Sequence, residues 1–395
     1  MFEQVADHTK VKVVKRDEIF QQNYFGSTEL LPFWVADMDF ETTPNVKNAL
    51  RDRVDNGLFG YEKSIDGLKK SAINWFDRRH NWVMDKQNLR TSPSIMASIG
   101  ILINLLTKEG DGVLVQTPSF PKFLHVVPNN GRKLIQSPLK LIDGRYEIDF
   151  EDFEEKAKEA KVFILCNPHN PVGRVWTSDE LNRLGKIAKE NDMYIISDEI
   201  HSDIIFKGNT FIPYGSLSDE LTQMSISLLS PAKTFNLPSN SSSFLYSTNK
   251  DVLEKFDKFM LNMYLDKTTA LESIAMETAY NTGEEWLDKL LVHVEDTVDY
   301  IDEYFKENIP QIKVTKTEGM YLVWLDFREL NLDAQEFNQL LVDEGIALNP
   351  GNWFGKAGIG FLRMNIATSR DMINQGLEII KRVVDKRINK PARCC

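Results

Sequence analysis

The chain has 395 residues, of which 42% are hydrophobic and 27% are charged, the balance of an ordinary globular protein. This length predicts two or three domains. The 58 acidic residues outnumber the 47 basic ones, and a net charge of −11 argues against a broad nucleic-acid-binding surface. The chain has three cysteines, no signal-peptide pattern and no apolar run of membrane-spanning length, so we expect a cytoplasmic protein without a membrane segment.

The middle of the chain alternates short apolar runs with helical patterns. Buried strands are predicted at 112–116, 162–166 and 194–197. Between the last two, Thr177 and Glu180 have the spacing of a capping box and predict the start of an amphipathic helix. Continuous apolar strands joined by a helix indicate an α/β fold with a mostly parallel sheet covered on both faces.

The last hundred residues have a different pattern. A long amphipathic stretch at 283–308 precedes a strand-like run at 319–327 and two further amphipathic segments. This pattern predicts a smaller α+β domain. We therefore divide the chain into an N-terminal segment (1–45) that packs on the small domain, a large domain (46–284) and a small C-terminal domain (285–395).

Polar residues follow two of the predicted strands. The loop NPHNPVG at 167–173 places Asn170 at the carboxyl end of a strand, where open α/β sheets bind ligands, although a tight turn explains the same residues. The next strand is followed by Asp198, His201 and Asp203, which suit helix capping and a solvated charge cluster. A metal site is a weaker alternative, because no second His/Cys pair at ligand spacing supports it.

Two basic residues stand among apolar neighbours. Lys233 follows an apolar stretch, and partial burial would lower its pKa so that the neutral amine can attack a carbonyl group, although a surface lysine on a loop is the alternative. Arg363 lies in the run GIGFLRMN and needs a carboxylate, either from a protein salt bridge or from a ligand.

Taken together and in this order, Asn170, Asp198, Lys233 and Arg363 resemble the fold type I pyridoxal-phosphate enzymes of the aspartate aminotransferase superfamily. Within it, the chain is similar to the MalY/PatB group of cystathionine β-lyase-like C–S lyases. The stretches that carry this resemblance are FWVADMDF at 33–40, LFGYEKS at 58–64, DEIHSDIIF at 198–206, EGMYLVWLDF at 318–327 and GFLRMNIA at 360–367.

The resemblance implies a role for each of these residues with pyridoxal 5′-phosphate. Lys233 would hold the cofactor covalently and later act as the base at the substrate Cα. Asp198 would pair with the pyridine nitrogen. The remaining contacts would be Asn170 and His201 at the phenolic oxygen, Phe120 and Ile200 on the ring faces, Arg363 and Asn170 at the substrate, and Ser230, Tyr61 and the amides of Ile95 and Met96 at the phosphate.

The implied activity is α,β-elimination from a cysteine S-conjugate such as cystathionine, carried out by a homodimer in which Tyr61 reaches the partner's site. An aminotransferase would use the same residues, and a cofactor-binding protein with a regulatory role is a third alternative. The sequence departs from the family pattern at Phe120, usually tyrosine, at Ser94, usually glycine, and at 238–240, which replaces a glycine-containing run.

Overall fold

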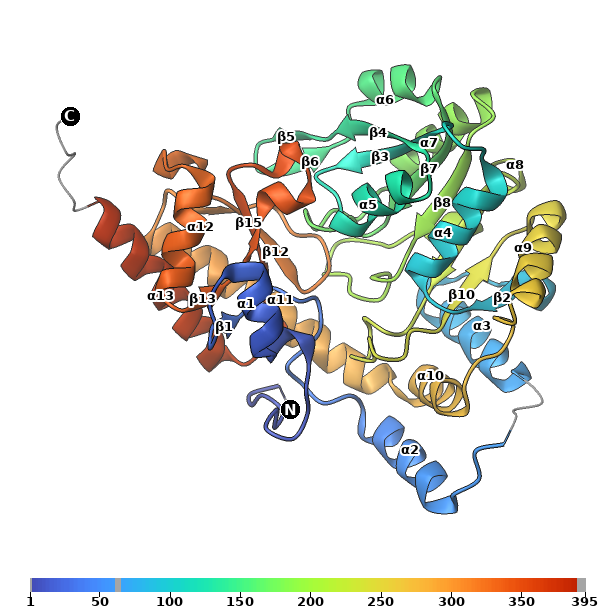
Figure 1. The fold of residues 1–395 in the computed structure, drawn as a ribbon, viewed down its shortest axis with the longest axis horizontal. Helices are drawn as coiled ribbons and strands as arrows, with labels where there is room; N and C mark the ends of the chain where they lie inside the picture. Colours follow the sequence, from blue (N-terminus) through green and yellow to red (C-terminus); the bar gives the residue numbers. More distant parts are fainter. Residues whose placement is uncertain (1, 61–64, 389–395) are drawn as a thin grey trace.

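The computed structural model describes residues 2–60 and 65–388, so the predicted phosphate contact Tyr61 lies outside the described residues. A seven-stranded sheet forms the centre of the larger part of the molecule (Figure 1). Its strands, in spatial order, are β2 (Leu89–Ser92), β10 (Ser243–Tyr246), β9 (Ser225–Leu229), β8 (Tyr194–Asp198), β7 (Ala160–Cys166), β3 (Gly112–Thr117) and β4 (Lys133–Pro138). The strands from β9 to β4 run parallel, and β10 is antiparallel to both of its neighbours. The predicted mostly parallel sheet is therefore confirmed.

The central strands are buried on both faces because helices cover each side of the sheet. In β3, Val113 and Val115 pack into one apolar cluster and Leu114 into another, as the alternation of side chains along a strand requires. The first cluster includes residues of α4 (Ile95–Leu106), α5 (Pro121–Asn129) and α9 (Lys250–Asn262). The second includes residues of α6 (Phe150–Ala157) and α7 (Ser178–Glu190).

The predicted capping box is present at the start of α7. The Thr177 hydroxyl accepts a hydrogen bond from the Glu180 amide, and the Glu180 carboxylate accepts one from the Thr177 amide. Two orphan amides of the helix terminus are satisfied in this way, which fixes where the helix begins.

The C-terminal part contains a four-stranded antiparallel sheet. Its strands, in spatial order, are β11 (Lys313–Val314), β12 (Leu322–Asp326), β15 (Phe361–Asn365) and β14 (Asn349–Pro350). The helices of this part are α11 (Glu284–Asn308), α12 (Ala334–Asp343) and α13 (Arg370–Ile388). The strand predicted at 319–327 is shorter in the structure because Gly319 instead forms an isolated bridge with Ile205.

The N-terminal segment joins this C-terminal part. Strand β1 (Leu31–Pro32) pairs in parallel with β13 (Ile346–Ala347), far along the chain. The boundaries at 45 and 284 stay a prediction.

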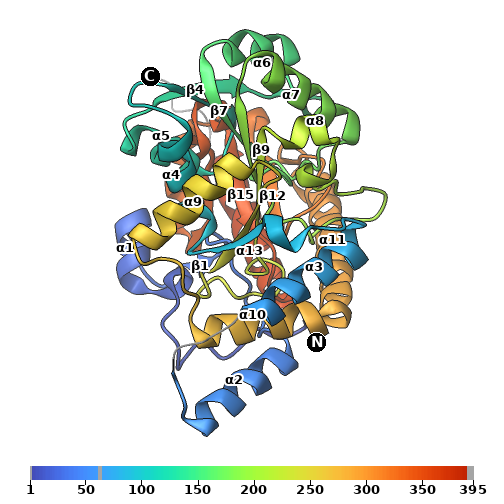
Figure 2. The same cartoon turned by 90° about the vertical axis from the view of Figure 1, so that its right-hand side faces the viewer.

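The remaining elements are the helices α1 (Glu18–Phe25), α2 (Pro44–Asn56), α3 (Asp66–His80), α8 (Asp219–Thr222) and α10 (Ala270–Thr282) and the hairpin of β5 (Lys140–Ile142) and β6 (Arg145–Glu147). Figure 2 shows α10 beside α2 and α3. Among the described residues, none of the helices has the length and apolar character that crossing a membrane requires.

Candidate active site

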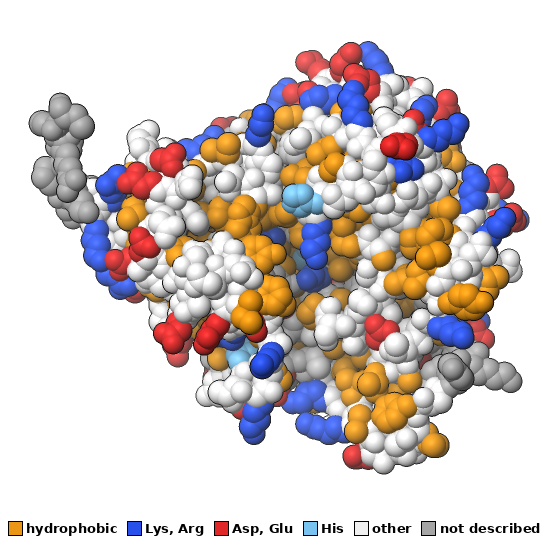
Figure 3. Space-filling model, viewed as in Figure 1, with side chains coloured by type: hydrophobic (Ala, Val, Ile, Leu, Met, Phe, Trp, Pro, Cys, Tyr) orange, Lys and Arg blue, Asp and Glu red, His pale blue; other side chains and the backbone are white. Residues whose placement is uncertain are grey.

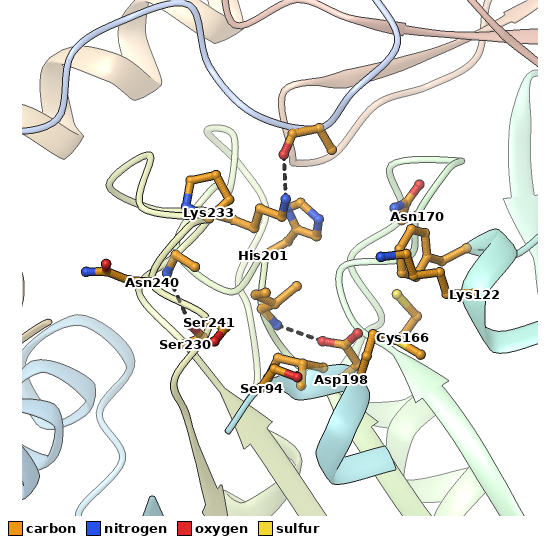
Figure 4. Close-up of a pocket in the computed structure, with 17 residues that line it drawn as sticks. Ser94, Lys122, Cys166, Asn170, Asp198, His201, Ser230, Lys233, Asn240 and Ser241 are labelled. Carbon is orange, nitrogen blue, oxygen red and sulfur yellow. Dashed lines mark hydrogen bonds between the residues drawn. The ribbon is translucent and has the colours of Figure 1, made fainter. Parts of the chain in front are cut away.

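A cavity of about 340 Å³ opens at the carboxyl ends of the parallel strands β7, β8 and β9. Ligands of open α/β sheets bind at this edge. The close-up shows Lys233 and His201 together on one side, Asp198 and Ser94 opposite them, and Asn170 beside Lys122 on a third wall (Figure 4). The predicted residues that line the cavity are Ile95, Met96, Phe120, Asn170, Asp198, Ile200, His201, Ser230 and Lys233.

Lys233 lies in the loop that follows β9. Its amine donates a hydrogen bond to the Ala36 carbonyl oxygen. Burial lowers the pKa of Lys233 to about 8, the nearby Asp37 carboxylate opposes the shift, and Arg363 and Lys122 add to it. A substantial fraction of this amine is therefore neutral near physiological pH, as a nucleophile or base requires.

The loop of Lys233 is fixed from behind by a buried carboxylate. Asp203 accepts hydrogen bonds from Thr234 Oγ1 at 2.6 Å and from Trp75 Nε1 at 2.9 Å, and its Oδ1 lies 2.7 Å from His80 Nε2. Asp203 therefore anchors the residue next to the lysine.

The alternative metal site of Asp198, His201 and Asp203 gains no support, because no metal-binding group of acidic, histidine or cysteine side chains is found in the described residues.

Asp198 ends β8 and is buried in the cavity wall. Its Oδ1 accepts a hydrogen bond from the Ile200 amide at 3.1 Å, and no salt bridge to Asp198 occurs in the described ranges 2–60 and 65–388. Burial raises the pKa of Asp198 to about 7. A turn follows this residue, so Asp198 does not cap a helix. Its carboxylate is available to a positively charged ligand group in the cavity.

His201 and Asn170 present neutral polar groups to the same space. Burial lowers the pKa of His201 well below its usual value, and the charges of Lys233 and Arg363 act in the same direction. The Nδ1 atom of His201 is buried without a hydrogen-bond partner within the described part of the chain. An unsatisfied buried nitrogen is costly, which indicates that a ligand completes the site.

Arg363 in β15 is buried beside the cavity. Its Nη1 donates to Asn170 Oδ1 at 3.1 Å, and its Nη2 donates to the Trp34 carbonyl at 2.8 Å and to Asn349 Oδ1 at 2.7 Å. Burial lowers the pKa of Arg363 to about 9, so the guanidinium is charged near neutral pH. Residues 2–60 and 65–388 supply no carboxylate to it, so the salt-bridge explanation of this arginine finds no protein partner.

The N-terminus of α4 forms another wall. Ser94 is its N-cap, with its hydroxyl accepting from the Ala97 amide, and the φ of Ser94 is −173°. This extended backbone suits any residue, so replacing the usual glycine with Ser94 causes no strain. Ile95 and Met96 occupy the first turn, whose amides have no acceptor within a helix. Ser230 completes this region.

The N-terminal segment 34–38 covers the site, which the sequence did not reveal. The Ala36 and Trp34 carbonyls accept from Lys233 and Arg363, as described above. Asn236 and Asn365 hold this segment by bonding its backbone from either side. The FWVADMDF motif at 33–40 was the sequence signal for this segment, because contacts made by backbone carbonyl groups leave no other pattern in a sequence.

Comparisons with known proteins place the chain in a family. The model of the family "Aminotransferase class I and II" matches residues 28–380. Cystathionine beta-lyase PatB of Bacillus subtilis is 36% identical over 360 residues, covering 90% of this chain and 93% of PatB. Protein MalY of Escherichia coli is 30% identical over 359 residues, covering 89% of this chain and 91% of MalY.

A solved structure agrees with these relatives. Cystalysin from Treponema denticola, whose crystal structure contains pyridoxal 5′-phosphate, superposes with a TM-score of 0.92 at 31% identity. The match covers 98% of this chain and 99% of cystalysin. The predicted fold type I architecture and the resemblance to the MalY/PatB group are thereby confirmed. The chain belongs to the aminotransferase class I and II family.

Proposed function

We propose that the protein is a pyridoxal-phosphate-dependent carbon–sulfur β-lyase acting on S-conjugates of L-cysteine. The reaction consumes one water and converts the conjugate into a thiol, pyruvate and ammonium. The observation that carries this proposal is the convergence on one cavity of a partly neutral amine, Lys233, and a buried carboxylate, Asp198. Beside them lies the guanidinium of Arg363, which has no carboxylate partner among the described residues. The lyase PatB among its relatives supports the choice of reaction.

The residues of the cavity fit the cofactor. Asp198 would hold the protonated pyridine nitrogen, which gives the buried carboxylate the positive partner that the described residues do not provide. His201, with its unsatisfied Nδ1, and Asn170 would contact the phenolic oxygen. Phe120 and Ile200 would pack against the ring.

Phosphate would bind at the N-terminus of α4. The amides of Ile95 and Met96 and the hydroxyl of Ser230 supply neutral donors there, and the helix dipole favours a dianion. Tyr61 is an additional proposed contact, contributed by a partner subunit.

The cofactor, when bound, withdraws electrons from the substrate Cα so that a proton can leave it. Lys233 is the proposed base that takes this proton, because its amine is neutral enough to accept it. Arg363, with Asn170, is proposed to bind the α-carboxylate and so to orient the Cα hydrogen toward the amine. Loss of the Cβ–S bond then releases the thiolate, which takes up a proton.

A panel of cysteine S-conjugates tests this function. We expect thiol, pyruvate and ammonium in equal amounts without any added 2-oxo acid. An aminotransferase would instead need a 2-oxo acid acceptor and would retain the carbon–sulfur bond. If every conjugate gives product only when such an acceptor is present, or if none reacts, the lyase proposal is wrong.

The Lys233 amine should react in a pH-dependent manner in protein freed of cofactor. We expect a small acylating reagent to modify it with a midpoint near pH 8, because the protonated form below that pH is not a nucleophile. Lys140 is the control, since its hydrogen bond to Asp149 raises its pKa and should shift its labelling to higher pH. Peptide mass spectrometry measures both midpoints. Equal midpoints for Lys233 and Lys140 would show that the site does not lower the pKa of Lys233.

The Asp198→Asn substitution should reduce elimination by about 10²–10⁴-fold, because the amide cannot hold the ring nitrogen in its protonated form. The side chain keeps its size, so the melting temperature should change little. Steady-state kinetics and thermal melting measure the two effects. A variant with near-normal elimination would show that this carboxylate serves only the turn at Ile200.

Assembly and location complete the proposal. We infer a homodimer, supported by exposed apolar side chains near the ends of α2 and α9, including Leu58, Phe59, Leu261 and Tyr264. Sedimentation at micromolar concentration would test it. A cytoplasmic location is also proposed, supported by the buried free thiol of Cys166.

A further inference from the structure

One charged side chain of the cavity has no part in the chemistry described above. Lys122 lies in the first turn of α5, directly after Pro121, which is preorganised for a helix start. Phe120 and Phe123 on either side pack edge to face, with their ring centroids 5.5 Å apart. The backbone that carries Lys122 is therefore fixed, and only its side chain is free to move.

Lys122 faces the cavity from the wall that also carries Asn170. The close-up shows its side chain reaching toward the cavity, opposite Ser230 and Asn240 (Figure 4). Its charge is felt by Lys233, whose pKa it lowers. In the space-filling view, basic side chains lie within a hollow near the middle of this face (Figure 3). Lys122 is exposed, so its ammonium group lies at the mouth of the cavity.

Among the described residues, no carboxylate pairs with this ammonium group. Lys122 forms neither an ion pair nor a hydrogen bond with any residue in the ranges 2–60 and 65–388, whereas many exposed lysines of this acidic chain have carboxylate partners. Asp198 is the single acidic residue among the side chains described as lining the cavity, and it faces the proposed ring nitrogen. The cavity mouth therefore has a positive charge without a counter-charge from the described part of the chain.

We propose that Lys122 binds an anionic group at the far end of the S-substituent, so that the preferred substrates are cysteine conjugates with a distal carboxylate. This inference rests on the proposed lyase function. With the α-carboxylate at Arg363 and the reacting Cα at Lys233, the S-substituent is the part left to extend toward the mouth. Apart from Lys122, Lys233, Asp198, His201 and Cys166, the lining side chains are apolar, hydroxyl or amide groups, which do not select a charge.

The test compares substrates that differ in distal charge. S-(2-carboxyethyl)-L-cysteine and S-propyl-L-cysteine share the chain of three carbons attached to sulfur but end in a carboxylate and a methyl group, and S-(2-aminoethyl)-L-cysteine carries a positive charge. For Lys122→Gln, we expect the ratio of kcat/KM for the carboxyethyl over the propyl conjugate to fall by about 2–5-fold, as for a solvent-exposed ion pair. Lys122→Glu should lower the ratio by about 4–25-fold and improve the aminoethyl conjugate, because reversing the charge roughly doubles the change in free energy.

Lys133 supplies the matched control. It is the next lysine along the chain, but it lies at the amino end of β4, opposite Gly112, and pairs with Glu159 at 2.6 Å. Lys133→Gln removes the same net charge far from the cavity and should leave the ratio unchanged. The preference of the unmodified protein for the carboxyethyl over the propyl conjugate should also weaken with added salt, since the proposed ion pair is exposed.

Binding measured without turnover separates this inference from the proposed function. In L-2-aminopimelate and L-2-aminoheptanoate a methylene replaces the sulfur of the two conjugates, so no thiol can leave. Calorimetry on the holoenzyme should show tighter binding of aminopimelate, and Lys122→Glu should abolish that preference even if no conjugate is a substrate. Equal losses for both analogues, or no change of the preference, would overturn the role of Lys122 whether or not the protein is a lyase.

Discussion

Lys233→Ala should lower elimination by about 10³-fold or more. The alanine removes both the covalent attachment of the cofactor and the base at the substrate Cα. The variant should still fold, because the hydrogen bond from Thr234 to Asp203, and not the lysine, holds this loop in place. The variant should still bind cofactor through Asp198, Ser230 and the amides of α4.

Two measurements check this expectation. Borohydride reduction of the unmodified holoenzyme should fix a pyridoxyl group on the peptide that contains Lys233, and mass spectrometry locates it. Single-turnover assays of Lys233→Ala measure the loss. A pyridoxyl group on another lysine, or residual elimination within about 10-fold of normal, would contradict the assignment of the whole site.

The sequence predicted those parts of the molecule that depend on local patterns. The strand predicted at 112–116 is Gly112–Thr117 in the structure, and the helix predicted after Thr177 begins at Ser178. Continuous apolar runs indicate buried strands directly, and a capping box indicates where a helix begins. Family resemblance supplied the positions of Asn170, Asp198 and Lys233, which the fold brings to one sheet edge and one cavity.

The contacts made across the chain could not be predicted in this way. Arg363 has an apolar sequence neighbourhood, but its partners Trp34 and Asn349 come from two other segments. No periodicity links residues so far apart, and a carbonyl acceptor has no residue signature. The position of Lys122 at the cavity could not be predicted either, because most lysines are exposed and nothing in the sequence distinguishes this one.

Arg363→Ala should raise KM and reduce kcat/KM by about 10²–10³-fold, because a guanidinium–carboxylate pair in a desolvated pocket is worth roughly 2–5 kcal/mol. The absorbance of the bound cofactor should change little, since its proposed contacts are other residues. Arg363→Lys should rescue only part of the loss, because an ammonium group lacks the two parallel donors. Steady-state kinetics with an S-alkyl cysteine measures each variant.

A substrate without the α-carboxylate decides whether this loss comes from binding or from folding. An S-alkyl cysteamine should be a poor substrate of the unmodified protein and should lose little more in Arg363→Ala, since it has no group for the arginine to bind. Arg174 is the control, a buried arginine paired with Glu318 at 2.8 Å and Glu180 at 2.9 Å. Arg174→Ala should lower the melting temperature and weaken both substrates equally, because it removes the buried charge that Glu318 and Glu180 share. If Arg363→Ala behaves like Arg174→Ala, with equal losses and a lower melting temperature, then Arg363 supports the fold and the α-carboxylate binds elsewhere.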